Sequence, residues 1–417
     1  MKIQDIKQEM FARAARVEST LTGRFAEIDA VAQANTLRVM EAFQEQRVTE
    51  GCFAGTTGYG YDDMGREVLD KVYAQVFGAE AALVRIGFVN GTHAISAALY
   101  AALKPGDTLL SVTGTPYDTM RTVIGISGEE YGSLKFYGIG YDEVALDQTG
   151  GPDYAEISRK VGAMRPAAVL IQRSRGYEER KALSIAEIGE IVACVKEACP
   201  DTLVVVDNCY GEFTETQEPT HVGADLIAGS LIKNPGGGSA PRGGYLAGSQ
   251  ELIDRAANRL TTPGIVAECG ATLGNNRLLF QGLFLAPHTV AQALKTAVFC
   301  AALFTDMGFE TNPTPFEQRD DIVQMVKLRT PENLKKFCKG IQEGSPVDSF
   351  VVPEPWQMPG YDCDVIMAAG AFIQGSSIEL SADGPLREPY MVYVQGGLTY
   401  ESGKLGILLA ASEMMDN

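Results

Sequence analysis

Four polar segments in this sequence each follow a short apolar run, and they carry the side chains best suited to chemistry. The segments are residues 90–93 (NGTH), 113–117 (TGTPY), 207–208 (DN) and 230–234 (SLIKN). In an open α/β sheet, ligands bind beyond the carboxyl ends of the strands. If the apolar runs are parallel strands, the four segments meet at one edge and form a single ligand site.

The first two segments contain groups suited to a phosphate and to a flat ring. Gly91 and Thr92 open a predicted helix, where free backbone N–H groups and the lack of a side chain on glycine favour a phosphate. Tyr117 is an aromatic that could stack on a planar ligand. Taken singly, Gly91 and Thr92 could also belong to a turn that caps a helix, and Tyr117 could be an aromatic residue of the core or its rim.

The last two segments place Asp207 and Lys233 at the ends of apolar runs. A carboxylate there is costly to ionise unless it meets a cation or a strong donor, such as the pyridinium N–H of pyridoxal phosphate (PLP). For Lys233 the apolar setting predicts a lowered pKa and an imine-forming amine. The alternatives are a helix cap for Asp207 and a surface lysine for Lys233. The order of all four segments favours the ligand site.

This order, with Asp207 followed 26 residues later (233 minus 207) by the lysine of Ser-x-x-Lys, resembles the fold type I PLP enzymes. Within that class the chain resembles the cystathionine beta-lyase and methionine gamma-lyase family, specifically its lyase-like "aluminium resistance protein" group. The resemblance rests on the segments IQRSRGYEER, SLIKNPGGG and YVQGGLTYES, and it spans roughly residues 55–410.

The resemblance implies a role for each matching residue. Lys233, Asp207 and Tyr117 would be catalytic, with Lys233 bound to PLP as a Schiff base, Asp207 paired with the pyridine nitrogen and Tyr117 stacked on the ring. The implied phosphate contacts come from three residues, Gly91, Thr92 and Ser230.

Two positions depart from the pattern of the lyases. A Tyr-x-Arg segment of the neighbouring subunit grips the phosphate in those enzymes, and this chain keeps Tyr61 but has Asp63 where the arginine would fall. The lyases also bind the substrate carboxylate with an arginine in a late strand, where this chain has Tyr393. The candidate replacement for that arginine is Arg387, because planar guanidinium donors match a carboxylate. Arg173 and Arg175 could face the O3′ atom of the cofactor or the substrate, or they could pair with Glu178 and Glu179. Arg242 is a further anion-binding candidate. Arg387 fits a solvated loop arginine equally well.

The elements that must position these residues alternate between strands and helices. Short apolar runs interleave with helical periodicity, as in residues 185–199, which is typical of βαβ units and a mainly parallel sheet covered by helices. The predicted strands are 81–89, 108–112, 134–139, 167–172, 203–208, 225–229 and 244–248. A long helical segment, roughly 267–305, leads to a mixed C-terminal region. We therefore expect a fold type I α/β architecture, with an N-terminal helical segment (1–55), a large PLP-binding domain (56–285) and a smaller α+β domain (286–417).

The composition excludes several classes of function. The 417 residues carry a formal net charge of −18, which opposes binding to nucleic acid or to an anionic membrane. Eight scattered cysteines without a C-x-x-C pair and only three histidines do not favour a zinc site or a disulfide framework. With no apolar run of membrane-spanning length and no signal-peptide pattern, the expectation is a cytoplasmic protein without a metal.

The predicted function is a PLP-dependent carbon–sulfur lyase that acts on a sulfur-containing amino acid by β- or γ-elimination. The resemblance further implies a homodimer or homotetramer with the active site at the subunit interface. Three alternatives stay open: another fold type I reaction (aminotransferase, aldolase or decarboxylase), a nucleotide-dependent oxidoreductase and a non-catalytic PLP-binding protein. The oxidoreductase lacks support because the segment FVNGTHA does not contain G-x-G-x-x-G.

Overall fold

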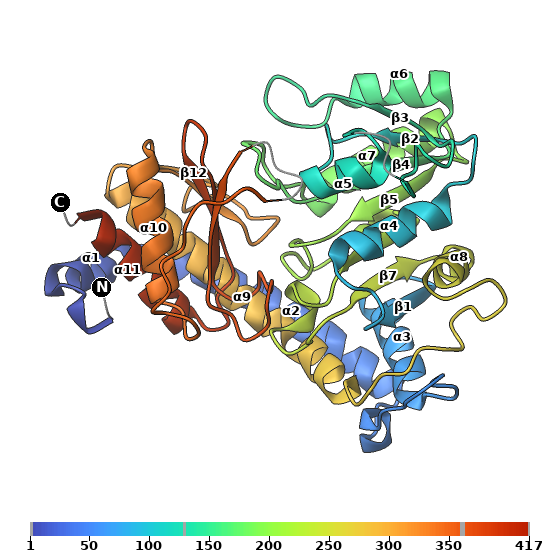
Figure 1. The fold of residues 1–417 in the computed structure, drawn as a ribbon, viewed down its shortest axis with the longest axis horizontal. Coiled ribbons are helices and arrows are strands. Elements are labelled where there is room, and N and C mark those ends of the chain that lie inside the picture. Colours follow the sequence, from blue (N-terminus) through green and yellow to red (C-terminus); the bar gives the residue numbers. More distant parts are fainter. Residues whose placement is uncertain (1–2, 128–130, 359–362, 416–417) are drawn as a thin grey trace.

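The computed structural model describes residues 3–127, 131–358 and 363–415. Two sheets form separate lobes, and one long helix, α9 (Asn276–Asp306), runs from one lobe to the other (Figure 1). Within the described ranges, none of the helices is long and apolar enough to cross a membrane.

The larger sheet has seven strands in the order β1-β7-β6-β5-β4-β2-β3. All run parallel except β7, which is antiparallel to both of its neighbours. The carboxyl ends of the other strands therefore lie at one edge, as the sequence predicted. The strands are β1 (Ala81–Arg85), β2 (Thr108–Ser111), β3 (Gly140–Glu143), β4 (Ala168–Gln172), β5 (Leu203–Asp207), β6 (Leu226–Ser230) and β7 (Gly244–Gly248).

Helices cover both faces of this sheet because its side chains alternate between two apolar clusters. Leu109, Leu170 and Val205 pack on one side with α4 (Gly91–Ala102), α5 (Asp118–Ile124) and α8 (Gln250–Leu260). Leu110, Val169 and Val204 point to the other side. The helices there are α3 (Met64–Val76), α6 (Tyr154–Met164) and α7 (Ile185–Ala198). Burial on both faces explains why the strands read as continuous apolar runs.

Two elements predicted from the sequence are wrong. Residues 134–139 form a turn closed by Ile139 N–H donating to Leu134 O, and the neighbouring strand is β3 at the sheet edge. Leu134 and Ile139 are apolar because they fill the cluster around α4 and α5, which a strand-like pattern does not reveal. The helical segment begins at Asn276 rather than 267, because Gly270, Leu273 and Gly274 adopt positive φ angles that a helix does not allow. Pro287 lies inside α9.

The second sheet has five antiparallel strands in the order β10-β11-β12-β9-β8. They are β8 (Glu310–Asn312), β9 (Gln324–Lys327), β10 (Val365–Ala369), β11 (Ser381–Pro385) and β12 (Met391–Gln395), with α10 (Pro331–Glu343) and α11 (Tyr400–Met415) beside them. The N-terminal helices α1 (Gln8–Ser19) and α2 (Thr22–Glu45) pack along α9. The proposed division at residue 285 falls within α9. The part of the chain that the structure describes also contains four short 3₁₀ helices: η1 (Ile3–Asp5), η2 (Glu50–Phe53), η3 (Pro219–Val222) and η4 (Asn234–Gly236).

Candidate active site

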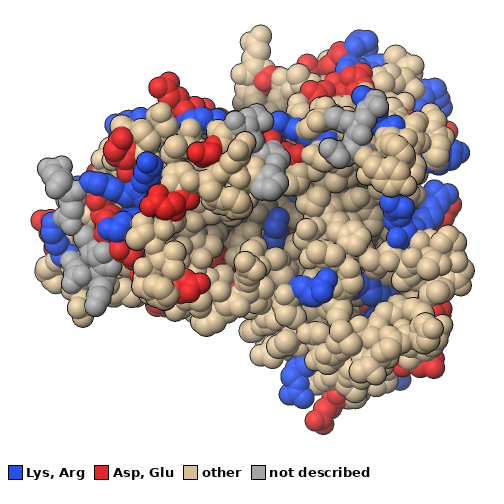
Figure 2. Space-filling view, viewed as in Figure 1, with Lys and Arg blue, Asp and Glu red and all other residues tan. Residues whose placement is uncertain are grey.

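The edge of the large sheet brings the four predicted segments together. Residues of β4 and β5 are paired so that Gln172 stands opposite Asp207, and Asp207 in turn stands opposite Ala228 of β6. Lys233 lies just beyond β6, and α4 begins at Gly91 beyond β1. On the face shown in Figure 2, the hollow between the two lobes is mostly uncharged, with basic side chains at its centre.

Asp207 is buried at the end of β5, with 6% of its surface exposed. Its Oδ1 accepts a hydrogen bond from Cys209 N–H at 3.1 Å. Burial raises the pKa of Asp207 above its ordinary value, although the charge of Lys233 and the Cys209 hydrogen bond act in the opposite direction. A protonated ring nitrogen placed here would donate to this carboxylate and favour its charged form.

Lys233 is half-buried, and its Nζ lies 3.9 Å from the centroid of the Tyr210 ring. Burial lowers the pKa of Lys233, but Cys209, Tyr210 and Asp207 outweigh burial and raise it well above its ordinary value. The predicted lowering is therefore wrong for the chain by itself, because the sequence pattern gave no view of the acceptors around the amine.

Gly91 and Ser230 are packed against each other at the start of α4. A Cβ on Gly91 would lie 3.1 Å from Ser230 Cβ, so only glycine leaves this space open without a shift. Asn90 caps the helix, and its Oδ1 accepts from His93 N–H at 2.9 Å. This cap does not use the N–H groups of Gly91 and Thr92, which stay available to a ligand. Ser230 Oγ is buried and has no hydrogen-bond partner among the described residues.

Tyr117 is fixed beside Gly91, Thr92 and Ser230, the residues that form the candidate phosphate cradle. Its backbone N–H donates to Gln172 Oε1 at 2.9 Å, and its hydroxyl is 3.1 Å from Thr92 Oγ1. Thr92 also lies 3.2 Å from the hydroxyl of Thr119, the second residue of α5. Burial raises the pKa of Tyr117, with Asp207 adding to the effect, so the phenol stays protonated at neutral pH. Tyr117 is thus held at its backbone by Gln172 and at its hydroxyl by Thr92.

These residues fit PLP. The unpartnered Ser230 hydroxyl and the free N–H groups at the start of α4 are donors for a phosphate. Asp207 offers a carboxylate to a ring nitrogen, Tyr117 offers a ring face, and Lys233 offers the amine.

Tyr61 and Asp63 lie in the loop before α3. Tyr61 is 54% exposed and stacks on Tyr59, with ring centroids 5.6 Å apart. Asp63 is buried and caps α3, and its carboxylate accepts from Arg66 N–H, Thr272 Oγ1 and two further donors, Thr56 Oγ1 and Asn276 Nδ2. Asp63 therefore holds this loop to the start of α9.

The four candidate arginines lie in different environments. Arg173 is fully buried, and its guanidinium donates within the chain from every nitrogen; the acceptors are Leu183 O, Asn208 Oδ1, Thr214 Oγ1 and Glu215 Oε1. The structure therefore does not leave Arg173 free for a substrate. Arg242 is exposed and lines a separate cavity of about 290 Å³ beside Arg85 and Gly270.

Arg175 and Arg387 both lie near Tyr393. Arg175 is 1% exposed, and its Nη1 donates to the backbone and side-chain oxygens of Asn312, both at 3.0 Å. Arg387 is exposed on the loop after β11. Burial raises the pKa of Tyr393 to about 12, and the charges of Arg175 and then Arg387 oppose this rise. Both cations are therefore within electrostatic reach of Tyr393.

Several site residues were not identified from the sequence. Tyr210 covers the amine of Lys233, and its hydroxyl lies 3.2 Å from Ser377 Oγ in the segment before β11. Thr119 completes the hydroxyl cluster around Thr92. Tyr210 follows Asp207 by only three residues, so its place after a strand end was a usable signal. Ser377 carried none, because the contact depends on how the two lobes are joined.

Comparisons with known proteins agree with this geometry. A family model described as methionine gamma-lyase matches residues 10–415. The uncharacterized protein YnbB of Bacillus subtilis is 49% identical over 403 residues, which are 96% of each chain. The crystal structure of a carbon–sulfur lyase involved in aluminium resistance from Clostridium novyi NT is 52% identical with a TM-score of 0.94, and the match covers 98% of this chain and 96% of that one.

A more distant structure supports the fold. The pyridoxal-5'-phosphate-dependent protein YhfS of Escherichia coli is 18% identical, with a TM-score of 0.63 over 92% of this chain and 97% of that one. At this identity the likeness concerns the fold alone. The predicted fold type I architecture is confirmed.

Proposed function

We propose that this chain cleaves a carbon–sulfur bond of a sulfur-containing amino acid by β- or γ-elimination, because it belongs to the methionine gamma-lyase family. The chain is a PLP-dependent lyase. The observation that carries the proposal is the position of Lys233. It lies at the same strand ends as the phosphate cradle, Asp207 is within electrostatic reach of it, and the Tyr210 ring lies beneath its Nζ. The name of the Clostridium novyi structure, a carbon–sulfur lyase, supports the same reaction.

PLP, when bound, supplies an electron sink that makes the Cα proton of an amino acid acidic. The residues that would hold it are Lys233 at the aldehyde, Asp207 at the ring nitrogen, Tyr117 at the ring face, and Ser230 with the N–H groups of Gly91 and Thr92 at the phosphate. Asp207 keeps the ring nitrogen protonated, because a buried carboxylate is stabilised by such a donor.

Lys233 is the base in this proposal. Its Nζ accepts the Cα proton of the substrate, and the Tyr210 ring stabilises the resulting ammonium by a cation–π contact. Tyr117 keeps its phenolic proton because burial raises its pKa, so it can donate to the departing sulfur. Thr92 orients this hydroxyl at 3.1 Å.

The side of the site formed by the second lobe suits an uncharged, sulfur-containing side chain. Val323, Met325 and Tyr393 form a buried cluster, against which Tyr177, Tyr210 and Met391 pack. Aromatic rings and methionine sulfurs make favourable contacts with a thioether. Arg175 is our preferred ligand for the substrate carboxylate, because Asn312 fixes its buried guanidinium whereas Arg387 is exposed.

Product analysis tests this function. Purified protein is incubated with methionine, cystathionine and cysteine, and ammonia, free thiol and 2-oxo acid are measured. Pyruvate would identify β-elimination and 2-oxobutanoate γ-elimination. The visible absorption band of the enzyme should vanish on borohydride treatment and be missing in Lys233→Ala, but not in the surface control Lys181→Ala. Transfer of the amino group without thiol release would contradict the lyase proposal.

We also propose that the enzyme is a cytoplasmic homodimer or homotetramer in which Tyr61 contacts the cofactor site of a second subunit. The exposure of Tyr59 and Tyr61, 73% and 54%, supports a surface that a partner covers. Light scattering of the purified protein, with and without Tyr61→Ser, measures the assembly directly.

A further inference from the structure

Asp383 is a buried carboxylate of the second sheet that the proposed mechanism does not use. It lies in β11, with 6% of its surface exposed. A Cβ on the next residue, Gly384, would meet the side chain of Leu334 in α10 at 2.5 Å, so Gly384 faces α10. Successive residues of a strand point to opposite faces, and α10 lies on the side of the second sheet away from the large lobe (Figure 1). Asp383 therefore points toward the large lobe.

Asp383 belongs to the face of the second sheet that borders the candidate active site. It stands opposite Tyr393 of β12, so the two side chains share one face. The Tyr177 ring lies 5.2 Å from the Tyr393 ring, and Tyr210 packs against the same cluster. Tyr210 in turn lies under Lys233, with 3.9 Å between Nζ and the centroid of its ring. A substrate side chain that extends from Lys233 toward the second lobe therefore approaches Asp383.

Hydrogen bonds hold a negative charge on this carboxylate. Gln395 Nε2 donates to Asp383 Oδ2 at 2.7 Å. Burial raises the pKa of Asp383 to about 6, while hydrogen bonds from Tyr177 and Gln395 and the charge of Lys233 oppose the rise. Asp383 is therefore mostly ionised above neutral pH, and it needs no cationic ligand because it already has donors.

We propose that Asp383 sets the charge preference for the substrate side chain: it excludes a side chain that ends in a carboxylate and admits an uncharged one. This inference rests on the proposed lyase function and narrows its substrate class. Like charges that face each other in a water-poor site repel strongly, and the repulsion acts without direct contact. A site gains specificity by such rejection as well as by attraction.

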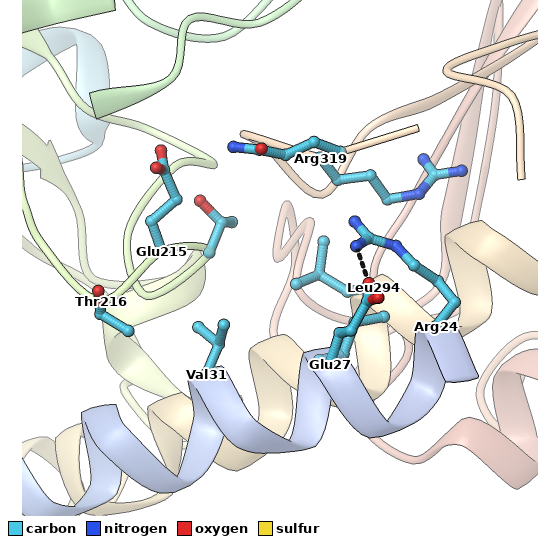
Figure 3. A pocket seen from close by; sticks show the side chains of 10 residues that line it. Arg24, Glu27, Val31, Glu215, Thr216, Leu294 and Arg319 are labelled. Carbon is cyan, nitrogen blue, oxygen red and sulfur yellow. Dashed lines mark hydrogen bonds and ion pairs between the residues drawn. The ribbon is translucent and has the colours of Figure 1, made fainter. Parts of the chain in front are cut away.

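The cavity of about 280 Å³ bordered by α2, α9 and the loop 214–216 does not offer an anionic side chain a second place (Figure 3). Glu27 and Glu215 line it, and Arg24 already pairs with Glu27 at 2.6 Å. Asp383 does not line this cavity, so the two carboxylates and Asp383 act on different spaces. The repulsion at Asp383 is therefore not relieved there.

Binding of two nearly isosteric amino acids to the PLP-loaded enzyme tests this inference without turnover. The side chain of glutamine is uncharged, that of glutamate carries the carboxylate, and neither has a sulfur leaving group. Their dissociation constants are measured at about pH 7.5 from the change in the visible absorption of the cofactor. We expect glutamine to bind at least about tenfold more tightly than glutamate, and Asp383→Asn to reduce this ratio to less than about threefold. Both amino acids carry the same α-carboxylate, so the ratio does not depend on Arg175.

Glu388→Gln is the matched control, because it removes an exposed carboxylate from the loop after β11 and should leave the ratio as in the wild type. A wild-type enzyme that binds glutamine and glutamate equally would overturn the inference and leave the lyase proposal standing. An unchanged ratio in Asp383→Asn would do the same. If glutamine, glutamate and methionine all leave the spectrum unchanged, the inference and the proposed function both fall.

The wild type alone provides a second measurement, which decides the question if Asp383→Asn does not fold. Asp383 takes up a proton below about pH 6, whereas the side chain of glutamate stays mostly ionised down to its ordinary pKa of about 4.3. The ratio should therefore fall between about pH 7.5 and pH 5. Among the described residues, Asp383 interacts with the titratable groups of Lys233, Tyr177 and Cys338 of α10, and burial raises the pKa of the Cys338 thiol, which stays neutral in this range. A ratio that does not change with pH would overturn the inference.

Discussion

The Nζ of Lys233 lies 3.9 Å above the ring of Tyr210, a residue held at the left-handed φ of 72°. Non-glycine residues rarely adopt this conformation, so the surrounding contacts must hold it. The Tyr210 hydroxyl contacts Ser377 and its carbonyl accepts from Ile322 N–H, so both lobes hold the ring under the amine.

Tyr210→Leu should lower the pKa of Lys233, because the cation–π contact that stabilises the ammonium is lost. The acid limb of the kcat profile should then move to lower pH, since a base of lower pKa is still neutral there. Tyr210→Phe keeps the ring and loses only the Ser377 contact, so its limb should stay near that of the wild type. Equal shifts in the two variants would assign the effect to the hydroxyl instead.

Asp207→Asn should reduce kcat by about 10²-fold or more, the size typical of losing one preorganised charge at a reaction centre. The amide cannot hold a proton on the ring nitrogen, so the visible spectrum should change as well. Steady-state kinetics and absorption spectra check this against Asp201→Asn, a control at a side chain that is 92% exposed. Unchanged kcat in Asp207→Asn would remove Asp207 from the mechanism.

The arginine that binds the substrate carboxylate is decided by two matched variants. Arg175→Gln should raise KM by at least about tenfold with a smaller change in kcat, because a buried bidentate donor is lost. Arg387→Gln should change KM by no more than about fivefold, the limit for an exposed ion pair. Arg175→Lys keeps the charge but lacks the planar guanidinium, so its KM should lie between those of Arg175→Gln and Arg387→Gln. A larger effect in Arg387→Gln would reverse the assignment.

The sequence predicted the sheet and its ligand edge because both depend on local patterns. Asp207, Ser230 and Lys233 directly follow apolar runs, and a parallel sheet brings such positions to one edge. Residues 134–139 misled the strand prediction, since an apolar turn packed under α4 has the same composition as a strand.

The arginines could not be resolved in the same way. Arg173 and Arg175 are separated by one residue after β4. Arg173 nevertheless donates all its hydrogen bonds to groups of the large lobe, whereas Arg175 points toward the second lobe. That difference depends on Asn312 and Glu215, partners far along the chain.

Glu212 makes the stability of the enzyme depend on pH. Its side chain is fully buried, Oε1 accepts from the Tyr245 hydroxyl at 2.9 Å, and Oε2 has no partner among the described residues. Burial raises the pKa of Glu212 to about 8, and the charge of Glu218 adds to the rise while Tyr245 and Lys233 oppose it. The folded protein therefore keeps a proton that the unfolded chain releases at an ordinary pKa of 4.5.

This difference costs the native state stability as pH increases, at up to about 1.4 kcal/mol per pH unit between the unfolded and folded pKa values of 4.5 and about 8. Glu212→Gln imitates the protonated carboxyl and keeps an acceptor for Tyr245, so it should be close to wild-type stability at a pH below the unfolded pKa of 4.5. As the pH increases to 8, the unfolding midpoint of the variant should exceed that of the wild type by a growing amount. Above pH 8 this difference between the two midpoints, the gap, should stay constant. Chemical denaturation across this range measures the gap. A gap that is independent of pH would show that Glu212 is charged in the folded enzyme.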